Sequence, residues 1–129
     1  MRYIRLTAVL LLAACGDGGT GPEINVTGTY MGNFTATSAP GVTYEGVFQL
    51  TQSGAQVTGI LATNAGRSAN ISGSISGSRI TATFTYTAGC TGSASTIADV
   101  SSSGTQLSGT YTSTDCLGTY AGGYSLTKQ

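Results

Sequence analysis

The stretch that decides the fold runs from 50 to 61 and reads Leu50-Thr51-Gln52-Ser53-Gly54-Ala55-Gln56-Val57-Thr58-Gly59-Ile60-Leu61. Apolar and polar residues alternate on both sides of Ser53-Gly54, as expected for two strands joined by a glycine-containing turn. Residues at i, i+2 and i+4 share one face of a strand, so Gly59 lies between Val57 and Leu61 on the apolar face. The stretch therefore predicts a β-hairpin whose buried face carries an inward glycine.

The pattern of an apolar residue, a spacer, glycine, a spacer and a second apolar residue recurs along the chain. It is found at 26–30, 44–48, 57–61, 71–75, 107–111 and 120–124. Together with glycine-containing turns, these units predict eight strands at roughly 25–36, 42–52, 56–63, 69–76, 79–87, 93–101, 105–114 and 119–128. Because every connection is short, the strands are expected to pair antiparallel in chain order. The predicted fold is all-β, an eight-stranded antiparallel up-and-down meander barrel.

The composition favours strands and excludes several functions. Of 129 residues, 20 are Gly and 22 are Thr, which suits strands and turns rather than helices. Five basic and five acidic residues balance, so no basic surface for nucleic acid is expected. The chain has no His, which removes the commonest general base and makes a Ser-His-Asp or Cys-His arrangement impossible. The length allows a single domain.

The N-terminus has the pattern of an export signal. Arg2 and Arg5 precede an apolar run that is shorter than the about 20 residues of a bilayer-spanning helix. The run ends in Leu12-Ala13-Ala14-Cys15, which resembles the lipobox of bacterial lipoproteins. The resemblance implies a signal peptide at 1–14 and a Cys15 that becomes the new N-terminus and carries several acyl chains, enough for stable anchoring. An ordinary signal peptide with a chance cysteine near its cleavage site is the alternative.

The residues after Cys15 predict how the chain is anchored. Gly16, rather than aspartate, follows the cysteine, and in the sorting pattern of such lipoproteins this implies the outer membrane, with the protein facing the periplasm or the surface. Residues 15–24 are rich in glycine and are expected to be a flexible tether, followed by the barrel domain at 25–129. The expected partner is therefore a membrane, through the lipid, and not nucleic acid.

Cys90 and Cys116 form an even pair once Cys15 is assigned to lipid. In an exported small domain such a pair predicts a disulfide, and buried free thiols are the alternative. Matching Val100 with Leu107 in the sixth-to-seventh hairpin places Cys90 within one residue of a position opposite Cys116. In a meander both cysteines then fall at the same end of the barrel.

The outward positions of the predicted strands are polar, as at Thr81, Thr83 and Thr85. A transmembrane barrel needs an apolar outer band, so that class is excluded. The domain resembles the small lipocalin-like and avidin-like barrels, whose first strand often begins with a Gly-Thr-aromatic unit, here Gly28-Thr29-Tyr30. Those families commonly use Trp, which this chain lacks, and none of their ligand-binding motifs matches residue by residue.

Three carboxylates in the barrel domain are the candidates for acid–base or metal chemistry. Glu45 and Asp99 fall on outward positions, and Asp115 falls beside Cys116 in a predicted loop. We interpret all three as solvated surface charges rather than as a glycosidase pair or a Ca²⁺ site. No catalytic residue, metal ligand or cofactor is predicted.

The interior is the feature with functional potential. An eight-stranded barrel either fills with side chains or holds one small ligand. Aromatic rings that alternate with glycines could wall a cavity, with Tyr hydroxyls as polar groups. The candidate ligand-binding residues are Tyr30, Tyr44, Phe48, Phe84, Tyr111 and Tyr124. A core filled by these same side chains is the alternative, and both remain open at this point.

The sequence thus predicts a non-catalytic, lipid-anchored envelope protein whose barrel is a binding or structural module; in the binding version, a small apolar ligand occupies the interior. The alternative is a barrel that binds an envelope protein through its loops or outer surface, like the small lipoprotein barrels that inhibit secreted proteases.

Overall fold

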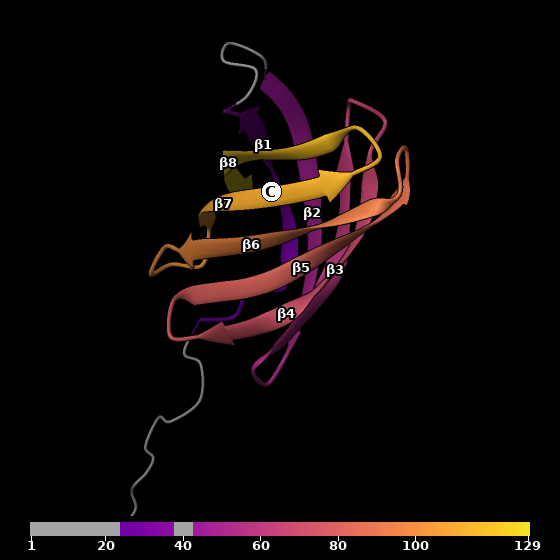
Figure 1. Cartoon of the computed structure of the whole chain (residues 1–129). Coiled ribbons are helices and arrows are strands. Elements are labelled where there is room, and N and C mark those ends of the chain that lie inside the picture. The colour runs from indigo at the N-terminus through magenta and orange to yellow at the C-terminus, as the bar shows by residue number, and fades with distance from the viewer. Residues whose placement is uncertain (1–23, 38–42) are drawn as a thin grey trace, which may run out of the picture.

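The computed structural model describes residues 24–37 and 43–129. The predicted signal peptide, Cys15 and the predicted tether up to residue 23 lie outside these residues. The described chain is all-β and closes into a barrel in which each strand pairs antiparallel with the next and β8 pairs with β1 (Figure 1). The strands are β1 (Gly28–Ala36), β2 (Thr43–Ser53), β3 (Gln56–Thr63), β4 (Ser68–Ser76), β5 (Arg79–Ala88), β6 (Gly92–Val100), β7 (Gln106–Asp115) and β8 (Gly118–Lys128). The predicted fold class is confirmed.

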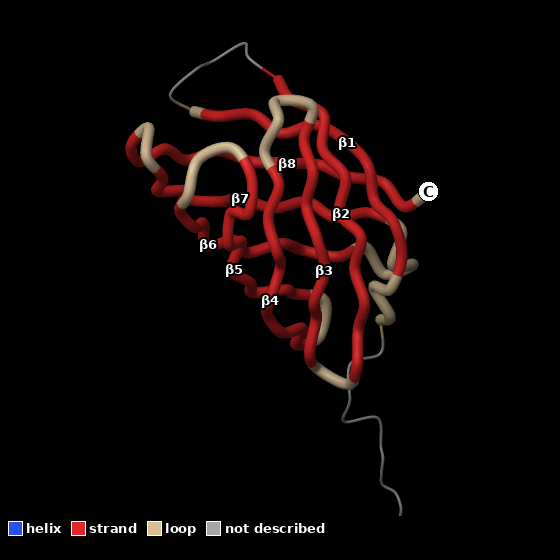
Figure 2. The backbone as a smooth tube through the Cα atoms, turned by 90° about the vertical axis from the view of Figure 1, so that its right-hand side faces the viewer, coloured by secondary structure: helices blue, strands red, loops and turns tan. Residues whose placement is uncertain are grey.

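The observed strands agree with the predicted ones to within one residue at every end but one. The first strand was expected from residue 25 and begins at Gly28, because residues 24–27 lie across one end of the barrel instead of pairing in it. Gly28 has φ +152°, a backbone angle that favours glycine, at the point where the chain turns into β1. Seen at right angles to the first view, the strands run obliquely around the interior (Figure 2).

One end of the barrel, which we call the closed end, carries the β2–β3, β4–β5 and β6–β7 turns and is covered by residues 24–27. Val26 is completely buried there, and its amide donates to the side-chain oxygen of Gln52 at 2.9 Å. The Tyr30 hydroxyl, also inaccessible to solvent, donates to the carbonyl of Gly104 at 2.9 Å. Aliphatic side chains fill the space behind them: Leu50, Val57, Ile75, Ile80, Val100, Leu107 and Leu126. This half of the interior is a packed core with its polar groups satisfied.

Four rings cross the middle of the barrel and form what we call the aromatic layer: Phe34, Phe48, Phe84 and Tyr124. Their centroids lie 5.0–5.8 Å apart in tilted and edge-on pairs, the spacing at which rings attract one another. The Tyr124 hydroxyl is 2.7 Å from that of Thr96, which itself donates to the carbonyl of Thr110. The layer separates the closed end from the other half of the interior.

The space beside the inward glycines is filled by atoms of neighbouring residues. A Cβ on Gly59 would overlap the carbonyl oxygen of Gln49 on β2, and one on Gly46 would overlap the Phe34 ring. At Gly109 it would come within 2.6 Å of the Tyr124 ring. The glycines therefore let neighbouring strands and rings approach closely in a tightly coiled barrel, and they leave no cavity at these points.

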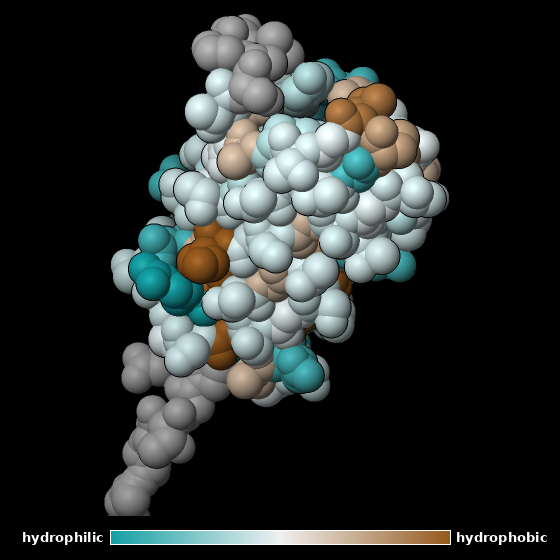
Figure 3. All heavy atoms as spheres, viewed as in Figure 1, coloured by the Kyte–Doolittle hydropathy of each residue, from teal (hydrophilic) through white to brown (hydrophobic). Residues whose placement is uncertain are grey.

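The outer face is polar but weakly charged. Thr and Ser alternate outward along most strands, and the face seen in Figure 3 is mostly pale, with a few strongly hydrophilic or apolar spots. Within residues 24–37 and 43–129, no helix is long and apolar enough to cross a membrane.

The disulfide joins the β5–β6 turn to the β7–β8 turn. Cys90 and Cys116 are bonded with their Cα atoms 5.7 Å apart, a usual separation for such a bridge. Val100 pairs with Leu107, and this is the register from which the sequence analysis predicted that the two cysteines lie close together. The predicted disulfide is confirmed, and it lies at the barrel end opposite the closed end.

Candidate functional site

The end of the barrel opposite the closed end, which we call the open end, contains a cavity of about 310 Å³. Phe34 and Phe84 of the aromatic layer form its floor, and the ends of β1, β2, β3, β5, β7 and β8 form its wall. The full lining is Phe34, Ala36, Tyr44, Leu61, Thr63, Ala65, Arg67, Phe84, Tyr86, Tyr111, Leu117 and Tyr120. A concave, mainly apolar site with a few polar groups is the usual make-up of a small-molecule pocket.

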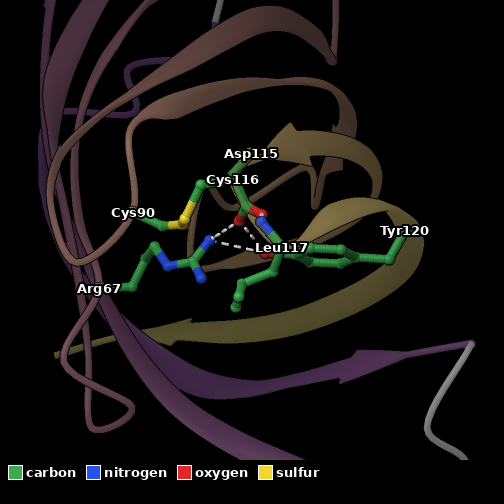
Figure 4. Close-up of a disulfide and its surroundings, with 6 residues drawn as sticks. All are labelled: Arg67, Cys90, Asp115, Cys116, Leu117 and Tyr120. Carbon is green, nitrogen blue, oxygen red and sulfur yellow. Dashed lines mark hydrogen bonds and ion pairs between the residues drawn. A yellow bond between two sulfur atoms is a disulfide. The ribbon is translucent and has the colours of Figure 1, made fainter.

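A cluster of three polar side chains borders the cavity beside the disulfide. Arg67, in the β3–β4 turn, forms an ion pair with Asp115 at the end of β7, and its Nη1 also donates to the Tyr120 hydroxyl at 2.6 Å (Figure 4). The Tyr120 hydroxyl donates in turn to Asp115 at 2.7 Å. The other carboxylate oxygen accepts the Leu117 amide at 2.8 Å. The cluster ties two turns together across the open end.

Burial and hydrogen bonding oppose each other at this cluster. The Asp115 side chain is 0% exposed, and burial alone would raise the pKa of its carboxyl. Hydrogen bonds from Tyr120, the Leu117 amide and Arg67 outweigh the effect of burial. They hold the pKa of Asp115 below its ordinary value of 3.8. Burial alone would lower the pKa of Arg67, but Asp115 and Tyr120 raise it. Both groups are therefore charged at neutral pH.

Two tyrosine hydroxyls of the wall, besides that of Tyr120, have partners within the barrel. Tyr86 lies 2.6 Å from the buried hydroxyl of Ser113, and the Tyr111 hydroxyl donates to the carbonyl of Thr35 at 2.9 Å. Burial, with smaller effects from neighbouring tyrosines, raises the pKa of Tyr111 to about 12. These hydrogen bonds hold the two rings in place, so that the rings present their apolar faces and edges to the cavity.

Three of the six predicted ligand-binding residues line the cavity. Tyr44, Phe84 and Tyr111 meet there from β2, β5 and β7. Phe48 and Tyr124 lie in the aromatic layer but do not line it. Tyr30 is at the closed end, where its hydroxyl is bonded to Gly104. The six residues thus lie at three different levels along the barrel axis. The alternation of residues along a strand predicts which side chains point inward, but not at which level they lie.

No protein-family model matches the chain, and no curated protein matches it in sequence. The chemistry of the site therefore rests on its lining residues, which offer ring faces, aliphatic groups and one guanidinium. In residues 24–37 and 43–129, no group of three or more His, Cys, Asp or Glu side chains gathers where a metal ion could be held.

The interpretation of Asp115 as a solvated surface charge is wrong. Its side chain is buried and paired with Arg67, whereas Glu45 and Asp99 are exposed as expected. The sequence reasoning also missed Arg67 and Tyr120 as site residues. A signal was present: the β3–β4 and β7–β8 turns lie at the same end of a meander, so the one cation of the first and the one anion of the second were candidates to meet.

Proposed function

We propose that this chain is a non-catalytic lipoprotein of the cell envelope whose barrel binds a small apolar or aromatic molecule at its open end. One observation carries the binding proposal: the cavity at that end has the aromatic layer as its floor and tyrosines in its wall, and the hydroxyls of Tyr86 and Tyr111 are already bonded. An apolar ligand there would gain from the hydrophobic effect and from ring contacts without breaking existing hydrogen bonds. The filled closed end gives the site a rigid base.

A titration with a neutral apolar fluorophore, N-phenyl-1-naphthylamine, tests the binding proposal. The Cys15→Ser chain is used, since it lacks the predicted acylation site, and the variants below are made in the same chain. We expect saturable fluorescence enhancement that is lost in Ala36→Phe, because Ala36 lines the cavity and a ring at this position fills it. Ala62→Phe is the matched control, as Ala62 is exposed on the outer face. Absence of saturable binding to the parent chain would exclude the small-molecule function.

The lipid anchor is tested separately, by fractionating cells that express the full chain. Cys15→Ser is expected to abolish acylation and to leave the protein unprocessed or released from the membrane, because the several acyl chains are its anchor. Membrane retention of the variant at the level of the parent chain contradicts the anchor.

A protein-binding role is the second candidate, and one feature of the outer face favours it. Register places Met31, Val47 and Ala62 side by side on β1, β2 and β3, with Ile60 next on the same face. Met31 and Ile60 are about half exposed. Polar substitution of Met31 and Ile60 would weaken a protein partner's binding and leave N-phenyl-1-naphthylamine binding unchanged.

A further inference from the structure

We infer that the open-end cavity selects a ligand that carries a carboxylate on an aromatic or short apolar body, and that Arg67 is the residue that recognises it. This inference rests on the proposed small-molecule function and adds the chemical class of the ligand. It starts from the hydrogen-bonding capacity of one side chain.

The guanidinium of Arg67 has N–H donors that make no hydrogen bond to the described residues. A guanidinium carries five N–H groups, two on each Nη and one on Nε. The bonds to Asp115 and Tyr120 both come from Nη1. Among the described residues, no hydrogen bond is made by Nε or Nη2, although the side chain is only 19% exposed. In Figure 4 these two nitrogens form the edge that faces away from Asp115 and Tyr120.

That edge has the geometry of a carboxylate site. The N–H groups of Nε and Nη2 point in parallel, and a carboxylate accepts two such bonds at once. The plane of the guanidinium is held by the pair with Asp115 on one edge and by Tyr86, whose ring centroid lies 4.8 Å from Cζ. The donors are therefore ordered before a ligand arrives, which reduces the entropy lost on binding.

The charges around the cavity agree with this assignment. Arg67 is the only charged side chain among the described lining residues. The carboxylate of Asp115 is already bonded to Tyr120, Leu117 and Arg67, and it is inaccessible to solvent. Glu45 is exposed on the outer face of β2. A ligand in the cavity therefore meets a positive charge in an apolar surrounding, where a charge-assisted hydrogen bond is strong.

The volume limits the size of the apolar body. A cavity of about 310 Å³ is at the lower end of the range for small-molecule sites, roughly 300–1,000 Å³. The ring-lined floor and walls suit a flat aromatic body in contact with Phe34, Phe84 and Tyr86. A one- or two-ring aromatic carboxylate fits this description, whereas a long acyl chain does not.

The test compares two ligands of nearly the same shape, naphthalene-2-carboxylate and naphthalene-2-carboxamide, by calorimetric titration of the Cys15→Ser chain at pH 7. We expect the carboxylate to bind about ten- to a hundred-fold more tightly, the ratio that corresponds to charge-assisted bonding. Equal affinities would overturn the assignment of Arg67 while leaving the proposed function intact. Failure of both ligands, together with N-phenyl-1-naphthylamine, to bind would overturn the proposed function itself.

Two variants locate the preference. Arg67→Gln/Asp115→Asn removes both charges of the pair, so no unpaired carboxylate is left buried, and the affinity ratio should fall to about one while the amide still binds. Asp115→Asn alone keeps the guanidinium and removes the nearest negative charge, so carboxylate binding should strengthen. Arg79→Gln/Asp99→Asn is the matched control at an exposed ion pair and should leave the ratio unchanged. A ratio that survives the loss of Arg67 would place the recognition elsewhere.

Discussion

Both ends of this barrel contain inward tyrosines, but one end is filled and the other holds a cavity. At the closed end, residues 24–27 lie across the opening, and Tyr30 is directed into the core, where its hydroxyl bonds to Gly104. At the open end, Tyr86 and Tyr111 bond to their own wall, and a cavity of about 310 Å³ is left between the rings. The comparison shows that a tyrosine fills a barrel or lines a cavity according to where its hydroxyl finds a partner.

The two ends should differ most in their response to loss of a tyrosine ring. Tyr30→Ala is expected to reduce the free energy of unfolding by about 3–5 kcal/mol, since Tyr30 is completely buried and the truncation leaves a cavity. Tyr44→Ala, at the rim of the open end, should cost about 1 kcal/mol or less. Urea denaturation monitored by circular dichroism measures both. Equal losses would show that the open end is packed as tightly as the closed end.

The disulfide provides the covalent reinforcement at the open end, where packing is incomplete. The bond joins cysteines that are 26 residues apart in the sequence. In the chain-entropy model, reduction of such a bond should lower the free energy of unfolding by about 3 kcal/mol, and with it the melting temperature. Cys90→Ala/Cys116→Ala should melt like the reduced parent and be insensitive to reductant. Two free thiols in the mass of the oxidised protein would contradict the bond.

The inward glycines test whether the cavity extends below the aromatic layer. Gly59→Val is expected to cost about 1–3 kcal/mol, because the added side chain meets the carbonyl of Gln49 and the Leu50 side chain. Gly109→Val should act similarly, against Tyr124. Thr58→Val, at the exposed neighbouring position, is the control and should be nearly neutral. Thermal unfolding measures all three, and a neutral Gly59→Val would mean that the interior has room for more atoms there.

Acid should loosen the open end before the closed end. The pKa of Asp115 is lower in the folded chain than its ordinary value of 3.8, so its ionised form stabilises the fold above about pH 4. That contribution is lost as the pH falls through the folded-state pKa. The melting temperature of the parent chain should therefore fall more steeply below about pH 4 than that of Asp115→Asn. Parallel curves for the two proteins would contradict a stabilising role for this carboxylate.

The sequence predicts the strands and their order better than it predicts the contacts at the candidate site. Alternation and glycine-containing turns are local features, so the eight strands, the meander order and the Cys90–Cys116 bridge could all be predicted. The pairing of Arg67 with Asp115 was missed: meander order places both residues at one end of the barrel, but whether the two side chains meet across 48 residues of chain depends on closure of the barrel. The position of a ring along the barrel axis also depends on strand stagger, which is why Tyr30 and Tyr44 were placed in one set although they lie at opposite ends.

The place where the chain enters the barrel, at residue 24, bears on how an anchored barrel would face the membrane. Ile24 lies at the closed end, near Gly104, and follows Cys15 by nine positions in the chain. Nine residues reach about 30 Å at most, even when fully extended. An acyl group on Cys15 would therefore keep the closed end within about 30 Å of the lipid surface and leave the open end free to face the aqueous compartment. Ligands would then be collected from solution rather than drawn out of the bilayer, as suits molecules polar enough to carry a carboxylate through water.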